Sequence, residues 1–255
     1  MSGAREHPGA TRGAAAQAGV MTTSHNEASA GRVAIVTGGS RGAGRATVRR
    51  LVSRGYAVVV NYLHDQRAAE STVEAILAGN GAAVAVRADV ADDVDVERLF
   101  DEAIEAFGGV DVVVHTVGSR TGPTPVTDID LEDFDALCRI NTRATLIVNR
   151  EAARRLRTGG AIVNLTSAPV RAGLPNHGEH AATTAATEVL IRMLALELRE
   201  RDITVNGVTL AVDGPCAPNR IADAVAYLVS DEGHGLTGHM IRIDEFEALN
   251  LRSSP

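Results

Sequence analysis

Residues 32–44 read RVAIVTGGSRGAG, and this stretch decides the fold of the chain. The apolar β-branched run that ends at Thr37 is typical of a buried strand, and a helical period begins near Ala43. The glycines between them allow a tight turn and a close approach of backbone to a pyrophosphate. They also present the N–H groups of a helix N-terminus to that anion. The stretch therefore predicts the strand–turn–helix that opens a dinucleotide-binding βαβ unit.

Short apolar runs alternate with helical periods along the rest of the chain. Strands are expected at residues 32–37, 57–61, 83–87, 110–115, 161–166, 204–209 and 239–243. Helices are expected at residues 43–53, 67–78, 94–107, 131–156, 179–199 and 221–229. Continuous apolar strands separated by helices indicate a parallel sheet that is covered on both faces. We therefore expect the α/β class, with a single doubly wound Rossmann sheet of about seven strands.

Composition excludes several classes of protein. A chain of 255 residues with 45% hydrophobic and 22% charged residues fits one soluble globular domain. The net charge of −7 and the absence of a basic tract argue against nucleic-acid and anionic-membrane partners. No apolar run approaches the ~20 residues of a membrane span. The two cysteines, Cys138 and Cys216, have no metal or disulfide spacing, so a cytoplasmic protein without a metal is expected.

The ends of the domain are set by composition as well. Residues 1–30 are rich in Ala, Gly, Ser and Thr and are expected to form a disordered tail, so that Met21 is an alternative start. Residues 31–255 are expected to form the Rossmann-type domain.

Further positions extend the pattern of the glycine turn. The spacing T-G-x-x-x-G-x-G, followed by Asp89-Val90 after the third strand, Asn141 on a long helix and Ser167 after the fifth strand, resembles the short-chain dehydrogenase/reductase family. The similarity covers residues 32–243. The cofactor-binding residues that the turn and the resemblance imply are Gly38, Ser40, Arg41, Gly42, Ala43, Gly44, Asn61, Asp89, Val90, Thr116 and Gly118.

Charge at the turn favours one cofactor. An NAD site usually has a carboxylate at the end of the second strand to bind the ribose 2′-hydroxyl. This chain has Asn61 there, and Arg41 lies within the glycine turn. Because a guanidinium pairs well with phosphate oxygens, NADP(H) is expected in preference to NAD(H). Arg41 as a solvated surface residue is the alternative interpretation.

The catalytic positions that the resemblance implies are only partly kept. Ser167 stands where the family has its serine, and Asn141 where it has its asparagine. His180 stands at the position of the family's tyrosine, and Thr184 at the position of its lysine. All 25 basic residues apart from histidine are arginines, so no lysine elsewhere can replace the missing one. The family's usual tyrosine–lysine mechanism cannot operate in this chain.

Other segments that face the substrate in the family are altered too. The family's Asn-Asn-Ala-Gly after the fourth strand is here residues 115–118, His-Thr-Val-Gly. The segment 210–219 is short where the family has a helical insert that closes over the substrate. Exclusion of water from a hydride transfer is therefore expected to be poor.

Four interpretations of His180 remain open. In the first, it is a substitute acid; in the second, it is the base that activates Ser167 as a nucleophile. In the third, it binds a metal together with His115, His177 and Glu179; in the fourth, it is a polar residue left in an unused site.

Two functions follow. The first is an atypical NADP(H)-dependent oxidoreductase of a carbonyl or alcohol substrate, with His180 in place of tyrosine. The second is a non-redox or non-catalytic protein of the same fold, because fold alone does not fix function; a cyclase or dehydratase and a structural subunit of an active reductase belong here. The apolar residues at 189–198 predict a homo-oligomer or a heteromer with an active reductase.

Overall fold

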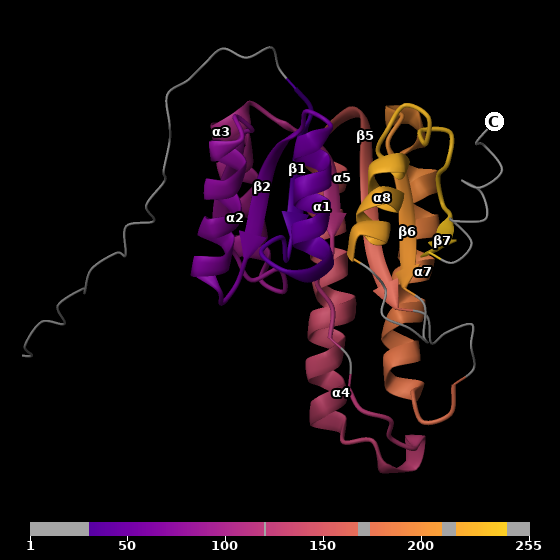
Figure 1. Ribbon diagram of the computed structural model, residues 1–255. Helices are drawn as coiled ribbons and strands as arrows, with labels where there is room; N and C mark the ends of the chain where they lie inside the picture. The colour runs from indigo at the N-terminus through magenta and orange to yellow at the C-terminus, as the bar shows by residue number, and fades with distance from the viewer. Residues whose placement is uncertain (1–30, 120, 168–173, 211–217, 244–255) are drawn as a thin grey trace, which may run out of the picture.

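The computed structural model describes residues 31–119, 121–167, 174–210 and 218–243, and these form one seven-stranded sheet (Figure 1). The strands are β1 (Val33–Thr37), β2 (Ala57–Tyr62), β3 (Ala83–Arg87), β4 (Val110–His115), β5 (Leu156–Ser167), β6 (Thr204–Leu210) and β7 (Met240–Arg242). Their order is β3-β2-β1-β4-β5-β6-β7, and every neighbouring pair is parallel. The expected doubly wound parallel sheet is confirmed. The residues predicted as a tail lie outside the described part.

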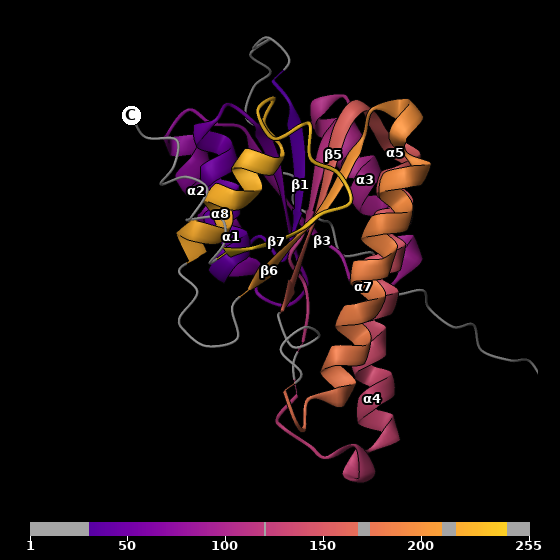
Figure 2. The same cartoon turned by 90° about the vertical axis from the view of Figure 1, so that its right-hand side faces the viewer.

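Helices cover both faces of the sheet. They are α1 (Gly42–Ser53), α2 (Gln66–Ala78), α3 (Asp93–Phe107), α4 (Leu131–Cys138), α5 (Ala144–Arg155), α7 (Gly178–Glu197) and α8 (Pro218–Leu228). The short turns are η1 (Val126–Asp128), η2 (Arg139–Arg143) and η3 (Arg199–Arg201). Helices α1, α2 and α8 pack on one face, and α3, α5 and α7 pack on the other (Figure 2). Within the described residues, no helix has the length and apolar character needed to cross a bilayer.

Strand β4 shows how the sheet joins the two layers. Val113 packs among the residues of α3, α5 and α7, whereas Val112 and Val114 pack with those of α1 and α8. Successive side chains of a strand point to opposite faces, so a strand with a helix layer on each side must be apolar throughout. This is why the central strands read as continuous Val and Ile runs.

The long helix expected at residues 131–156 is interrupted. It divides into α4 and α5 at η2, a π-helical turn with Asn141 at its middle. A π turn inserts one extra residue and so rotates the following residues around the helix axis, whereas the prediction from sequence treated residues 131–156 as one continuous helix. Beyond the sheet, α4 and the first turns of α7 run side by side (Figure 2).

Strand β5 begins at Leu156, five residues before the expected start at Ala161. Leu156 pairs with Val110, and the register then shifts before Val112 meets Ala161. Gly159 within this shift has a φ of 78°, a conformation that disfavours other residues. The prediction from sequence ended a helix at residue 156 and began the strand at residue 161, so it placed no strand at residues 157–160.

The packing of α3 on the sheet can be tested at Phe100. Its side chain is 0% exposed, and Phe100→Ala should lower the free energy of unfolding by about 3–5 kcal/mol, through lost burial and the cavity left behind. Val94 lies on the same helix but is 70% exposed, so Val94→Ala should change stability by less than about 0.5 kcal/mol. Chemical denaturation of both variants measures the difference. Equal effects would contradict this packing.

Candidate functional site

The glycine turn lies at the carboxyl end of β1 and leads into α1. Gly38 and Gly42 have φ values of 62° and 54°, which favour glycine. The Gly39 N–H donates to the carbonyl of Asn61 at 3.0 Å, so the turn is held against the end of β2. In a doubly wound sheet, ligands bind beyond the carboxyl ends of the strands, where this turn lies.

The turn has the form of a phosphate cradle. A Cβ on Gly44 would overlap the Gly38 carbonyl oxygen and lie 3.0 Å from Thr116 Oγ1, so only glycine lets α1 begin this close to β1. A Cβ on Gly42 would meet nothing within 4 Å, which leaves open space at the helix N-terminus. The N-cap residue, Arg41, makes no side-chain capping bond. The first N–H groups of α1 are thus suited to an anion, and these residues fit a dinucleotide pyrophosphate.

Asn61 faces inward at the end of β2. Its Oδ1 accepts the Gly38 N–H at 3.3 Å, and its Nδ2 donates to the Ala88 carbonyl at 3.0 Å. The side chain is buried. The Asn61 amide is therefore already bonded to backbone on both sides. It connects the glycine turn after β1 to the segment that follows β3.

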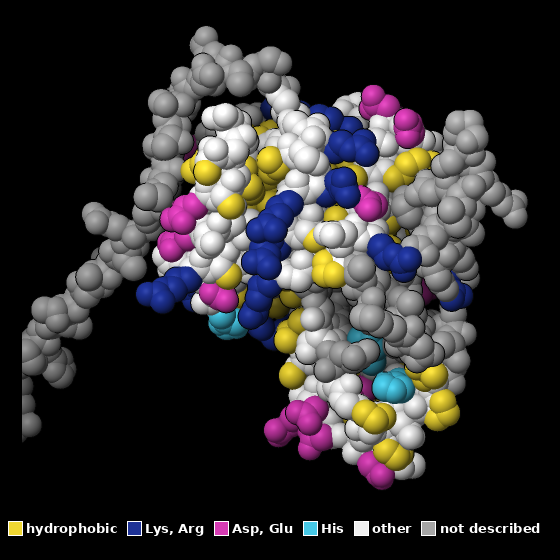
Figure 3. Space-filling model, viewed as in Figure 1, with side chains coloured by type: hydrophobic (Ala, Val, Ile, Leu, Met, Phe, Trp, Pro, Cys, Tyr) yellow, Lys and Arg dark blue, Asp and Glu magenta, His cyan; other side chains and the backbone are white. Residues whose placement is uncertain are grey.

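Arg41 and two further arginines form a row. Arg41, Arg45 and Arg49 are exposed and stand four residues apart, so they share one side of α1. Dark-blue side chains follow this helix in the space-filling view (Figure 3). The arginine row, defined as these three residues, begins at the glycine turn. It gives a positive electrostatic potential to this end of the crevice, which lies beyond the carboxyl ends of the strands.

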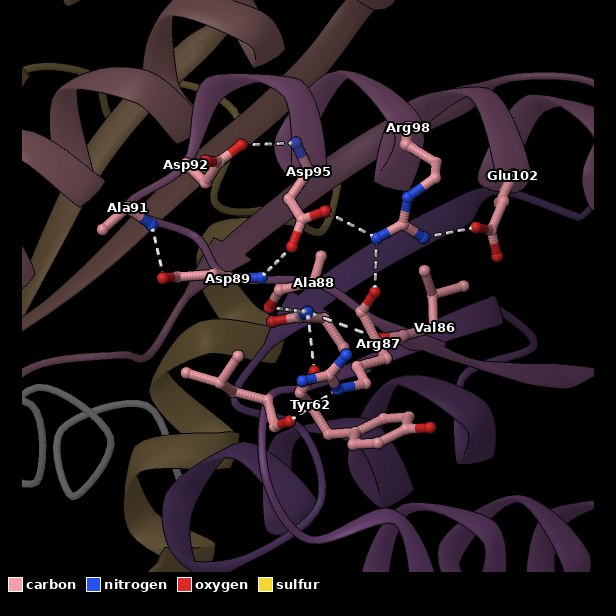
Figure 4. Close-up of polar contacts among 12 residues, drawn as sticks. Tyr62, Val86, Arg87, Ala88, Asp89, Ala91, Asp92, Asp95, Arg98 and Glu102 are labelled. Atoms are coloured by element: carbon pink, nitrogen blue, oxygen red, sulfur yellow. Dashed lines mark hydrogen bonds and ion pairs between the residues drawn. The ribbon is translucent and has the colours of Figure 1, made fainter. Parts of the chain in front are cut away.

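Asp89 lies in the turn between β3 and α3. Its carboxylate accepts the Ala91 N–H at 2.9 Å, and its own N–H donates to Asp95 at 2.8 Å (Figure 4). Arg139 of η2 forms an ion pair with its other oxygen at 2.7 Å. Burial works to raise the pKa of Asp89, but Arg139 and the Ala91 N–H outweigh it and lower the pKa. Val90 beside it is buried. Asp89 is therefore a fixed anion at the crevice.

Thr37 and Thr116 tie β1 to β4 at the glycine turn. Thr37 Oγ1 accepts the Thr116 N–H at 3.0 Å, and Thr116 Oγ1 donates to the Thr37 carbonyl at 2.6 Å. Thr37 Oγ1 is also 2.9 Å from Nδ1 of His115, which is 1% exposed. Burial lowers the pKa of His115 to about 4, so its ring is neutral at physiological pH. Thr37 is the threonine of the T-G-x-x-x-G-x-G spacing, but its partners at the end of β4 could not be predicted, since they lie far away in the sequence.

Asn141 joins the loop after β4 to α7. Its Oδ1 accepts the Ser119 N–H at 2.8 Å, and its Nδ2 donates to the Ser119 carbonyl at 2.9 Å. Nδ2 also donates to Thr183 Oγ1 at 3.1 Å. Gly118 lies beside the amide, where an added Cβ would be 3.5 Å from Asn141 Oδ1. Asn141 thus sets the end of this loop relative to α7.

His180 lies in the first turn of α7 and is 4% exposed. The Thr183 hydroxyl donates to the His180 carbonyl at 3.0 Å, so Asn141, Thr183 and His180 form one chain of hydrogen bonds. Thr184, one turn after His180, is also buried. Ser167 ends β5, where its backbone pairs with Leu210 of β6. The Ser167 side chain and most of the short segment 210–219 lie outside the described part.

A second connection crosses from the β4 loop to α7. Thr121 Oγ1 donates to the buried carboxylate of Glu179, and the Thr124 N–H donates to the Asn176 carbonyl at 2.7 Å. Local sequence could not predict these pairs, because their partners are more than fifty residues apart. They hold the loop against the start of α7.

The metal interpretation of His180 finds no support in this geometry. His115, His177, Glu179 and His180 all belong to the described part of the chain, and no group of three or more metal-ligating side chains occurs within that part.

Comparison with known proteins identifies the family. A family model described as enoyl-(acyl carrier protein) reductase matches residues 38–212. A versicolorin reductase of Emericella nidulans is 33% identical over 261 residues, which cover 88% of this chain and 98% of that protein. A hydroxynaphthalene reductase-like protein of Metarhizium majus is 38% identical over 180 residues, 70% of this chain and 67% of that protein. The chain belongs to the short-chain dehydrogenase/reductase family.

Solved structures agree. A short-chain dehydrogenase from Burkholderia cenocepacia in complex with NADP has a TM-score of 0.76 at 32% identity, covering 83% of this chain and 95% of its own. A blue fluorescent protein from a metagenomic library in complex with NADPH has a TM-score of 0.77 at 31% identity, covering 83% of this chain and 96% of its own. These structures confirm the resemblance to the short-chain dehydrogenase/reductase family that the sequence predicted.

His115 should make stability depend on pH. Its folded pKa of about 4 lies below the ordinary 6.5, so protonation favours the unfolded chain. The contribution of neutral His115 is fully present above about pH 6.5 and should decrease by about 2 kcal/mol on acidification to pH 4.5. Denaturant titrations at several pH values measure this.

His115→Asn is the control, since an amide does not titrate. The variant should lose about 2 kcal/mol less than the parent between pH 7 and pH 4.5. An unchanged pH dependence in His115→Asn would show that a different group controls acid stability.

Proposed function

We propose that this protein is an NADP(H)-dependent oxidoreductase that interconverts a carbonyl and an alcohol, with His180 as its acid–base group. The observation that carries the proposal is the hydrogen-bond chain from Asn141 through Thr183 to the backbone of His180, at the edge of the sheet that bears the glycine turn. This chain keeps the family's asparagine joined to the position where relatives have their proton donor.

Relatives support a nicotinamide cofactor. Two similar structures contain NADP or NADPH, and similar proteins are named versicolorin reductase, elsinochrome reductase and hydroxynaphthalene reductase-like protein. Cys138 and Cys216 lack a disulfide spacing, which favours a reducing compartment, and we place the activity in the cytoplasm.

Each retained residue has a role in carbonyl reduction. The bound cofactor supplies the hydride. Ser167 holds the substrate oxygen, and His180 transfers a proton to that oxygen as it gains negative charge. Asn141 holds the loop at Ser119 and a water for proton resupply. Thr184 brings no cation to the site, so His180 must act without the electrostatic help that a lysine gives.

Removal of the imidazole tests the catalytic role. His180→Ala should reduce NADPH-dependent turnover of a carbonyl substrate by about 10²–10⁴-fold, the usual contribution of a general acid. The substrate is found first, with a broad panel of aromatic and aliphatic ketones, by following NADPH absorbance. NADPH affinity should remain within about threefold, because the change removes proton transfer rather than cofactor contacts.

His234→Ala serves as the matched control. This histidine pairs with Asp202 at 3.1 Å, beyond the C-terminal end of α7, whereas His180 lies in the first turn of that helix, and its loss should leave turnover unchanged. Full activity of His180→Ala, or no turnover with any ketone in the panel, would refute the catalytic proposal.

Arg41 is proposed to select the 2′-phosphate of NADP(H). Arg41→Ala should weaken NADPH binding by about tenfold, the equivalent of a single exposed phosphate contact, and leave NADH binding within about twofold. Calorimetric titration of both nucleotides measures the two affinities. Arg49→Ala, two turns further along the arginine row, is the control and should affect NADPH less. Equal losses for NADPH and NADH would mean that Arg41 does not recognise the phosphate.

A non-redox or structural role is the second candidate. Thr184 in place of a lysine and an apolar stripe on α7 favour it. Val189, Met193 and Leu196 are exposed on that helix, whereas Ile191, Leu194 and Leu198 are buried in the core. The stripe fits a homodimer or a heteromer with an active reductase. Sedimentation with and without NADPH decides: tight NADPH binding by an oligomer without turnover would favour this candidate.

A further inference from the structure

The π turn η2 contacts both ends of the crevice. Arg139 and Asn141 are two residues apart, about half a helical turn, so their side chains leave η2 in different directions. Arg139 reaches the turn after β3, and Asn141 reaches the loop after β4. The same five residues therefore touch the segment around Asp89 and the segment around Ser119.

On the β3 side, two arginines hold the turn. Arg139 pairs with Asp89 at 2.7 Å, and Arg143 donates to the Ala91 carbonyl. Asp89 in turn accepts the Ala91 N–H. One oxygen of the Asp89 carboxylate pairs with Arg139 of η2, and the other accepts the N–H of Ala91 in the same turn. Any new donor to Asp89 must therefore share an oxygen with Arg139 or with Ala91.

On the other side, Asn141 holds the loop and α7 with three hydrogen bonds of 2.8, 2.9 and 3.1 Å. Two of these go to the backbone of Ser119, and the third goes to Thr183, which bonds the His180 carbonyl. Because Asn141 is buried in the centre of η2, a shift of that turn moves these bonds together.

We infer that Arg139 is a positioning residue that couples the adenosine end of the cofactor site to Asn141, because its guanidinium joins Asp89 to the π turn that carries Asn141. The inference rests on the proposed cofactor binding. The adenine amino group is a hydrogen-bond donor, and Asp89 is a charged acceptor on the β3 side of the glycine turn. A donor at Asp89 changes how the carboxylate is shared with Arg139, and η2 transmits that change to Ser119.

A cofactor fragment separates this coupling from catalysis. Adenosine 2′,5′-bisphosphate has the adenine and the 2′-phosphate but no nicotinamide, so it cannot touch Asn141 itself. At saturation it should slow hydrogen exchange of the Ser119 amide at least threefold in the parent protein. In Arg139→Met the fragment should still bind, with an affinity reduced by about fivefold or less because the pair is partly exposed. At saturation the fragment should leave the hydrogen exchange of the Ser119 amide unchanged in Arg139→Met.

Two further variants complete the test. Asp89→Asn removes the charge at the other end of the pair and should likewise abolish the effect on Ser119, which guards against misfolding of a single variant. Arg150→Met removes an exposed arginine of α5 whose pair with Asp93 is 4.0 Å long, and it should preserve the effect. Equal slowing in the parent and Arg139→Met, or none in the parent, would overturn the coupling.

Failure of the proposed function gives a different result. A parent protein that binds neither NADPH nor adenosine 2′,5′-bisphosphate would refute cofactor binding and the coupling together. A parent that binds NADPH and reduces a ketone, but whose Ser119 amide does not respond to the fragment, would refute the coupling alone.

Discussion

The close approach of α1 to the end of β1 is the constraint on which the site depends. No side chain fits at Gly44, because a Cβ there would overlap the Gly38 carbonyl oxygen. The contact places the helix N-terminus and its unpaired N–H groups at the carboxyl edge of the sheet. Asn61 then fixes the turn from the side by accepting the Gly38 N–H and donating to the Ala88 carbonyl. Arg41, the exposed N-cap residue of α1, carries a positive charge at this turn.

Buried polar groups join this turn to the rest of the crevice. Thr37 connects β1 to Thr116 and to the neutral ring of His115, and Asn141 connects the β4 loop to α7. Buried polar groups are costly unless they are hydrogen-bonded, so these partners fix one arrangement of the loops. The turn η2 bonds to both sides of the site, through Arg139 to Asp89 after β3 and through Asn141 to Ser119 and Thr183.

The chemistry proposed for this network differs from that of its relatives in charge. No lysine occurs anywhere in the chain, and Thr184, at the position that the family resemblance assigns to that cation, is buried. The ordinary pKa of an imidazole lies near neutrality, whereas that of a phenol lies near 10, so a phenol depends more on a neighbouring cation to release its proton. Replacement of both residues together is therefore chemically consistent, whereas loss of the lysine alone would leave tyrosine too weak an acid to protonate the substrate oxygen.

The sequence by itself determined the class of fold, the doubly wound parallel sheet of about seven strands and the position of the glycine turn. These follow from local patterns: continuous apolar strands, helical periods, and glycines at residues 38–44. Tertiary structure decided the π turn at Asn141, the early start of β5 at Leu156 and the inward amide of Asn61. Each depends on a partner far away in the chain, as Asn141 does on Ser119 and Leu156 on Val110. Local propensity carries no information about such partners, because hydrogen bonds and packing between distant segments form only when the sheet has assembled.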